Sequence, residues 1–191
     1  MLALVLAGGA TSACSAGGPE TAAVPRDDGR SFTMDFPADF TVSGDAKTLA
    51  RESYFPLDDG SVLLGGCYSG PDYAGTNFGS ACVVVSVSPA GEGGDCARFD
   101  GDLLCGAEQG VRDAVVNGLP FKRGDMSDAA MGHRLEARDY WTVHDGQRYD
   151  IRLFLSYTAT GMYTPGEKRE FSREDCWDRL TAVLNTFSFR R

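Results

Sequence analysis

The sequence predicts a protein of the α+β class, in which strands joined by tight turns are followed by one amphipathic helix. Three stretches carry this prediction: the alternating segment from Arg134 to Tyr157, the β-branched run at 81–88, and the helical stripe that begins at Ser172. Strict alternation of apolar and polar residues is typical of half-buried strands. Apolar residues at every third or fourth position are typical of a helix that packs on a core.

The first residues predict export. Residues 1–13 are apolar and then small, and they are too short to span a bilayer, which takes about 20 residues. They resemble the hydrophobic and cleavage regions of a secretory signal. The sequence at 11–14 resembles a bacterial lipobox, although Thr11 stands where Leu is usual. We therefore expect 1–14 to be a signal peptide with a lipobox and Cys14 to be lipidated; ordinary signal cleavage and a cytoplasmic apolar start are the alternatives.

The rest of the chain divides into a tether and one domain. Residues 15–30 are rich in Gly, Ala, Pro and Asp without an apolar period, which predicts a disordered tether. Residues 31–191 are numerous enough for a single domain with its own core. The formal net charge of −9 and the lack of a Lys/Arg cluster argue against binding to a phosphate backbone, so we expect no nucleic-acid partner.

Cysteine usage fits an oxidising compartment. The six cysteines are Cys14, Cys67, Cys82, Cys96, Cys105 and Cys176. If Cys14 is lipidated, the closest pairs favour the disulfides Cys67–Cys82 and Cys96–Cys105, with Cys176 left as a buried free thiol. Pairing of all six would allow fifteen connectivities, so this pairing is a preference.

Along the domain, local patterns predict the following elements: strands at 32–36 and 40–42; a hairpin of 49–55 with 61–67 around the Asp-Asp-Gly at 58–60; a central strand at 81–88; a loop at 89–106; a short helix or strand at 107–116; a polar loop at 122–132; an exposed loop at 158–171. Ser172 as N-cap and Asp175 three residues later form a capping box. The residues that follow on one helical stripe are core residues: Cys176, Trp177, Leu180, Val183, Leu184 and Phe187.

The segment 134–157 predicts a long hairpin around His-Asp-Gly at 144–146, since Asp-Gly is a turn signal. Its apolar residues are odd-numbered on both strands, and facing residues share one side of a sheet. A two-residue loop would pair residues of opposite parity, so we predict a three-residue loop in which Trp141 faces Tyr149. This register places Asp139 on the apolar face, at a sheet edge, a polar pocket or a bulge.

Both ends of the domain resemble a known family. The opening FTMDFPADFTV at 32–42 and the closing DRLTAVLNTFSF at 178–189 are similar to the frame of PsbP-like/Mog1-like domains, which occur in bacterial extracytoplasmic lipoproteins. The resemblance implies a mainly antiparallel central sheet with helices packed on its faces, an α/β/α sandwich. It also implies a binding or assembly factor without catalytic residues. The cysteine-bearing insert at 66–106 departs from this frame and leaves the partner open.

Motifs of catalysis are lacking. The sequence has no P-loop, G-x-G-x-x-G, H-E-x-x-H or C-x-x-C pattern, and we expect no cofactor and no metal. His144 falls in the hairpin turn. His133 is a candidate general base or metal ligand, with a structural hydrogen bond as the alternative. The Asp-Gly sequences at 58–60 and 100–102 lack the twelve-residue calcium pattern and are interpreted as turns.

Two sets of residues are candidates for a partner surface: Arg138, Arg148 and Arg152 on the polar face of the hairpin, and Met162 and Tyr163 in the exposed loop. Glu136 and Asp150 interleave with the arginines, so a solvated, salt-bridged face is the alternative. We expect a non-enzymatic envelope protein, exported and either secreted or anchored to the membrane through Cys14, that acts as a protein- or ligand-binding module, with another envelope protein as the expected partner. The alternatives are a secreted inhibitor that presents the Cys96–Cys105 loop and an enzyme with a site around His133.

Overall fold

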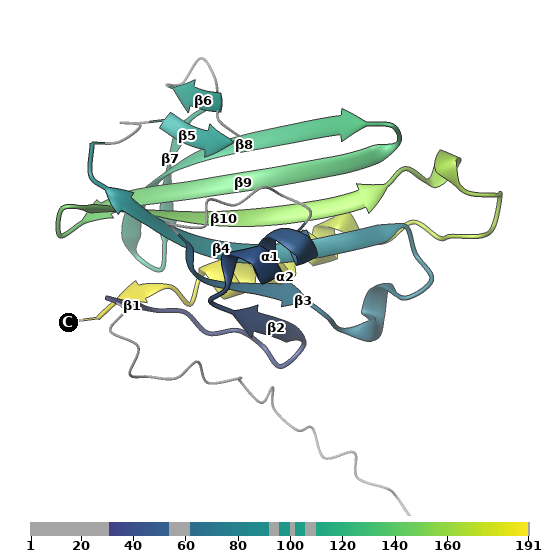
Figure 1. The fold of residues 1–191 in the computed structure, drawn as a ribbon, viewed down its shortest axis with the longest axis horizontal. Coiled ribbons are helices and arrows are strands. Elements are labelled where there is room, and N and C mark those ends of the chain that lie inside the picture. Colours follow the sequence, from purple (N-terminus) through teal and green to yellow (C-terminus); the bar gives the residue numbers. More distant parts are fainter. Residues whose placement is uncertain (1–30, 54–61, 92–95, 100–101, 106–109, 191) are drawn as a thin grey trace, which may run out of the picture.

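The computed structural model describes residues 31–53, 62–91, 96–99, 102–105 and 110–190, so Cys14, the leader and the tether lie outside the described residues. Its main sheet has seven strands in the order β2-β3-β4-β10-β9-β8-β7, and every neighbouring pair is antiparallel (Figure 1). The strands of this sheet are β2 (Phe40–Ser43), β3 (Val62–Tyr68), β4 (Phe78–Pro89), β7 (Arg112–Val116), β8 (Leu119–Ala130), β9 (His133–His144) and β10 (Gln147–Thr158). The remaining elements are β1 (Phe32–Thr33), α1 (Ala46–Ser53), η1 (Pro71–Tyr73), β5 (Cys96–Phe99), β6 (Asp102–Cys105), η3 (Thr160–Met162), α2 (Arg173–Leu184) and β11 (Ser188–Phe189).

Helix α2 packs on one face of the sheet and builds the larger core. Ser172 caps the helix, because its side chain accepts a hydrogen bond from the Asp175 amide at 3.2 Å. The predicted stripe is confirmed: Leu180 is fully buried, and it lies in one cluster with the inward side chains of β10, among them Ile151 and Leu153. Each such aliphatic side chain contributes about 1.5–3 kcal/mol on burial.

A polar contact joins α2 to strand β9. Glu136 accepts hydrogen bonds from the hydroxyl of Tyr157 at 2.8 Å and from Nε1 of Trp177 at 3.3 Å, and it pairs with Arg173 at the start of the helix. Burial raises the pKa of Glu136, but the hydrogen bonds from Arg173 and Tyr157 outweigh it and hold that pKa below its usual value. The charged form of Glu136 therefore stabilises the docking of α2.

The opposite face carries α1, which lies in front of the sheet in Figure 1. Asp45 caps this helix through the amide of Thr48 at 3.0 Å, and Leu49 packs in a second cluster with Val84 and Phe154. The prediction of a strand at 49–55 is wrong for residues 49–53, which belong to α1. Ala46 and Leu49, three residues apart, are both buried on one side of this helix.

The class is α+β with a mainly antiparallel sheet, as the sequence predicts. The two helices are short, 12 residues in α2 and 8 in α1. They cover only part of the sheet, so the described residues do not show the helical layers of an α/β/α sandwich. Neither of them is long and apolar enough to cross a membrane.

The predicted three-residue loop of the central hairpin is wrong. Gln147 pairs with His144, so the turn consists of Asp145 and Gly146 alone, and both have positive φ (48° and 73°), as a type I′ turn requires. Trp141 consequently faces Asp150 instead of Tyr149. The parity argument fails because β10 is buried on both faces, so its apolar residues are not confined to one side.

Three segments predicted as irregular or ambiguous are strands. Residues 122–132 belong largely to β8, residues 89–106 contain the paired strands β5 and β6, and the ambiguous 107–116 contains β7. Strand β8 has few buried side chains beyond Gly124, so pairing with β9 holds it in place without an apolar pattern. The turn that follows β8 contains Met131, which has a φ of 49°. The sequence did not predict this turn, because it contains neither Asn-Gly nor Asp-Gly.

Candidate functional site

Four charged side chains form a buried ladder on the α1 face of β9 and β10. Arg148 and Asp150 are 1% and 4% exposed, and Nη2 of Arg148 lies 2.6 Å from Oδ1 of Asp150. Arg152 stands opposite Asp139, with 3.5 Å between Nη2 and Oδ2. Burial raises the pKa of Asp139, and the nearby Arg152 counteracts this rise. Asp139 thus lies in a polar pocket, which is one of the three predicted alternatives.

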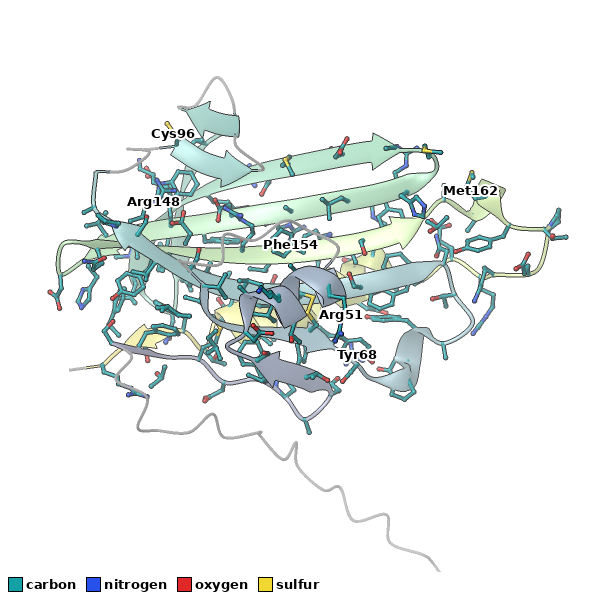
Figure 2. All side chains as sticks on the ribbon, in the orientation of Figure 1. Arg51, Tyr68, Cys96, Arg148, Phe154 and Met162 are labelled. Carbon is teal, nitrogen blue, oxygen red and sulfur yellow. A yellow bond between two sulfur atoms is a disulfide. The ribbon has the colours of Figure 1, made fainter. Side chains whose placement is uncertain are left out.

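This ladder anchors the β5–β6 hairpin rather than a partner. Nη2 of Arg148 also donates to the carbonyl of Cys96 at 2.6 Å, and β5 packs against β8 and β9. Figure 2 shows Arg148 beside Cys96. The stem of the hairpin is therefore held on the sheet at β5.

The arginines predicted to share one polar face, as a candidate partner surface or as a solvated face, are separated and partly buried. Arg148 and the side chain of Arg152, which is 15% exposed, lie on the α1 face, so the prediction of a solvated face is wrong for both. Arg138 lies on the other face, where its guanidinium stacks 3.8 Å above the ring of Trp177. Polar alternation along a strand could not distinguish a solvated face from a buried, paired one.

The cysteines follow the predicted pattern where the structure describes them. Cys67 and Cys82 form a disulfide between neighbouring strands, with Cα atoms 4.0 Å apart. Cys176 is a buried free thiol, and burial raises its pKa to about 12. Cys96 is disulfide-bonded and stands opposite Cys105 in the β5–β6 register, while the side chain of Cys105 lies outside the described residues.

A groove of about 660 Å³ opens at the end of the sheet where β9 begins and β10 ends. Its lining residues are Phe78, Gly79, Asp128, Ala129, Ala130, His133, Arg134, Leu135, Ser156, Tyr157, Thr158 and Tyr163. His133 is exposed, and its ring atom Nδ1 lies 3.3 Å from the hydroxyl of Thr158. Within the described part of the chain, this hydroxyl is the only hydrogen-bond partner of the His133 side chain. The lining combines aromatic and aliphatic side chains with a few polar groups, which is the composition of a binding site.

The groove is lined by one histidine and one carboxylic acid, His133 and Asp128. Asp139, the carboxylic acid whose pKa burial raises, is not among the lining residues. Among the residues that the structure describes, no three His, Cys, Asp or Glu side chains are placed to hold a metal ion.

The two loop residues of the predicted surface lie beside this groove. Tyr163 lines it, and Met162 is 60% exposed. Met131, 90% exposed, occupies the β8–β9 turn, which contacts η3 through a hydrogen bond from the Ala159 amide to the carbonyl of Gly132 at 2.8 Å. A side chain at Gly132 would collide with Met162, because a Cβ there would lie 2.4 Å from its Cγ. Two exposed methionines therefore share one end of the molecule, which Figure 2 marks by Met162.

Sequence reasoning found His133, Met162 and Tyr163 but missed the groove between them. Its other lining residues come from the ends of β4, β8, β9 and β10 and meet only through the sheet register. Leu135 and Ser156, for example, are cross-strand neighbours. Had the two-residue turn at Asp145-Gly146 been predicted, the register would have placed these two residues opposite each other.

Comparison with known proteins gives likenesses of structure alone. No protein-family model matches the sequence, and no curated protein matches it. A crystal structure from Bacteroides thetaiotaomicron VPI-5482 is similar with a TM-score of 0.43 and 11% identity over 84% of this chain; the match spans 46% of the Bacteroides chain, less than half of its length. LpqN of Mycobacterium tuberculosis, described as involved in cell envelope biogenesis, is similar with a TM-score of 0.41 and 10% identity, over 84% of this chain and 83% of LpqN.

Proposed function

We propose that this chain is an exported, lipid-anchored envelope protein that binds another envelope protein without catalysing a reaction. The domain would be of the PsbP-like kind that its two ends resemble, and Cys14 would carry the lipid. The leader, the tether and the Cys67–Cys82 disulfide support export. The binding role is supported by the groove beside His133, which exposed methionines flank.

The observation that carries the binding role is the position of this groove. It lies at the end of the sheet that carries Met131 and Met162, whereas the N-terminal strand β1 pairs with β11 at the other end (Figure 1). A chain held by residues before Ser31 would therefore present the groove away from its attachment point. Exposed apolar side chains beside it, Met131 and Met162, suit contact with a second protein.

Intact mass of the membrane-fraction protein, expressed from its own leader, tests the anchor. A chain that begins at Cys14 and carries a diacylglyceryl increment is the expected result. A chain that retains Met1 with every thiol reduced would exclude export and refute the proposal.

Site-specific photo-crosslinking in intact cells tests the binding site. A photoreactive residue at Met162 should give a discrete cross-linked product. The matched control is Val143, which is equally exposed at 60% but lies beside the turn at the opposite end of β9. Equal products from both positions, or none from Met162, would refute a partner at the groove.

A further inference from the structure

Strand β8 leaves part of the sheet edge open. Strand β7 pairs only with residues 119–123 of β8, so Gly124–Ala130 forms the border of the sheet beyond it. Figure 1 shows this half of β8 running past the end of β7 along the rim of the sheet. No other strand of the described chain pairs with its outer side.

The register fixes which backbone groups point outward. Ala130 faces His133 across a two-residue turn, so these two residues exchange both hydrogen bonds of a narrow pair. Alternation from this pair directs the backbone groups of even-numbered residues to β9 and those of Asp125, Ser127 and Ala129 outward. The Ala129 amide is capped by Oδ1 of Asp128 at 2.6 Å, which leaves two outward amides and three outward carbonyls.

Side chains along this edge are small, and a hollow lies on each side of it. Gly124, Ser127, Ala129 and Ala130 give an incoming backbone close access. The groove alone is lined by Ala130, His133 and Thr158, which the register puts on the α1 face, and a hollow of about 270 Å³ alone is lined by Ser127 and Glu136, on the α2 face. Five residues line both hollows: Asp128, Ala129, Arg134, Leu135 and Tyr157. A strand added here would send alternate side chains toward the two hollows, which is how strand addition obtains specificity.

Charge selects the kind of strand. Within 124–130 the charged residues are Asp125, which is paired with Arg112 and Arg123, and the exposed Asp128; across the strand pair, the exposed Arg134 lies opposite Ala129. A second copy of the chain would join two molecules of formal net charge −9. A segment with positive charge is attracted instead.

We propose that Gly124–Ala130 recognises its partner by strand addition and takes an extended, positively charged segment of that partner. This inference rests on the proposed binding function and names its mode. The main-chain groups of Asp125 and Ser127 supply the hydrogen bonds, and Asp128 favours the cation.

Amide exchange and peptide titration by NMR test the proposal on the folded domain. In the free protein, the amides of Asp125 and Ser127 should exchange fast, and those of Met126 and Asp128 slowly. A peptide of alternating Lys and Val should protect the two outward amides and shift resonances from Gly124 to Ala130. The same peptide with Glu in place of Lys should bind at least about tenfold more weakly.

Ser127→Pro provides the matched variant, with Ser127→Ala as its control. Proline is tolerated where the amide of an edge strand faces solvent, so the variant should fold while its binding of the Lys peptide weakens about tenfold. Unchanged binding in Ser127→Pro, shifts outside the edge, or protection of Asp125 and Ser127 by self-association alone would overturn the inference. If cross-linking from Met162 persists in Ser127→Pro cells, the binding function stands and only strand addition fails.

Discussion

Replacement of Arg148 by methionine should be among the most destabilising single changes in the domain. Arg148 is 1% exposed and donates from both Nε and Nη2 to Asp150, at 2.6–3.0 Å, and from Nη2 to the carbonyl of Cys96. Methionine fills similar volume but leaves the Asp150 carboxylate, itself 4% exposed, without its cation. Charge-assisted hydrogen bonds contribute about 1.5–3 kcal/mol each. The variant no longer has to bury a charged guanidinium, and the desolvation cost that it avoids offsets part of this loss. The net loss should be about 3–5 kcal/mol of the free energy of unfolding.

Urea unfolding at neutral pH measures this loss as a lower midpoint with an unchanged slope. The double variant Arg148→Met/Asp150→Leu should regain most of it, because the unpaired buried charge is then gone. Arg134→Met, at an exposed position, should change the free energy of unfolding by less than about 0.5 kcal/mol. A loss below about 1 kcal/mol for Arg148→Met, or a double variant no more stable than the single one, would refute the reasoning.

Three further results are expected. The double variant Cys67→Ala/Cys82→Ala removes a disulfide that closes a loop with a sequence separation of 15. It should lower the free energy of unfolding, measured by urea titration, by about 3 kcal/mol, and a loss near zero would contradict this expectation. Burial raises the pKa of Cys176 and of Tyr73 to about 12, so both groups keep their protons in the folded state above the pH at which they lose them in the unfolded chain. Stability should therefore fall as the pH rises from the unfolded pKa values, about 8.5 for Cys and about 10 for Tyr, to about 12. Cys176→Ala should flatten this decline as measured by circular dichroism, and an unaltered decline would argue against it. The pKa of Glu136 is lower in the folded state than in the unfolded chain, so ionised Glu136 stabilises the fold above its unfolded pKa of about 4, and this stability is lost as the pH falls. Glu136→Gln should therefore be less stable at neutral pH, and its stability should depend less on acid. Parallel profiles of stability against pH for the two proteins would exclude this role.

Local patterns sufficed where one side of an element is buried. The α2 stripe and the neighbouring cysteines of β3 and β4 were predictable, because helical spacing and a short closed loop each define a single arrangement. Strand β10 was different: Tyr149 and Ile151 face one core while Arg148 and Asp150 are buried on the other. In a strand that is buried on both faces, the alternation of apolar and polar residues distinguishes two buried faces and does not distinguish a buried face from a solvent-exposed one.

The buried ladder and the groove depend on register, which one sequence did not determine. With the turn reduced to Asp145-Gly146, Arg152 falls opposite Asp139, and the polar residue that seemed misplaced gains its partner. The β8 edge was missed for a related reason: its pairing with β9 relies on backbone hydrogen bonds, and its side chains are too polar and small to show a period. Patterns of hydrophobicity report burial, and this edge has little.

The pairing of β1 with β11 has a practical meaning for how the protein can be handled. The Arg190 amide donates to the carbonyl of Ser31 at 2.8 Å, so the beginning and the end of the folded domain are almost in contact. A short linker could therefore join them, and new ends could be opened at the Asn117-Gly118 turn without cutting a buried strand. Conversely, a fluorophore or affinity tag fused at this end of the folded domain would sit beside Ser31, at the end of the sheet opposite Met162, and would leave that opposite end unobstructed.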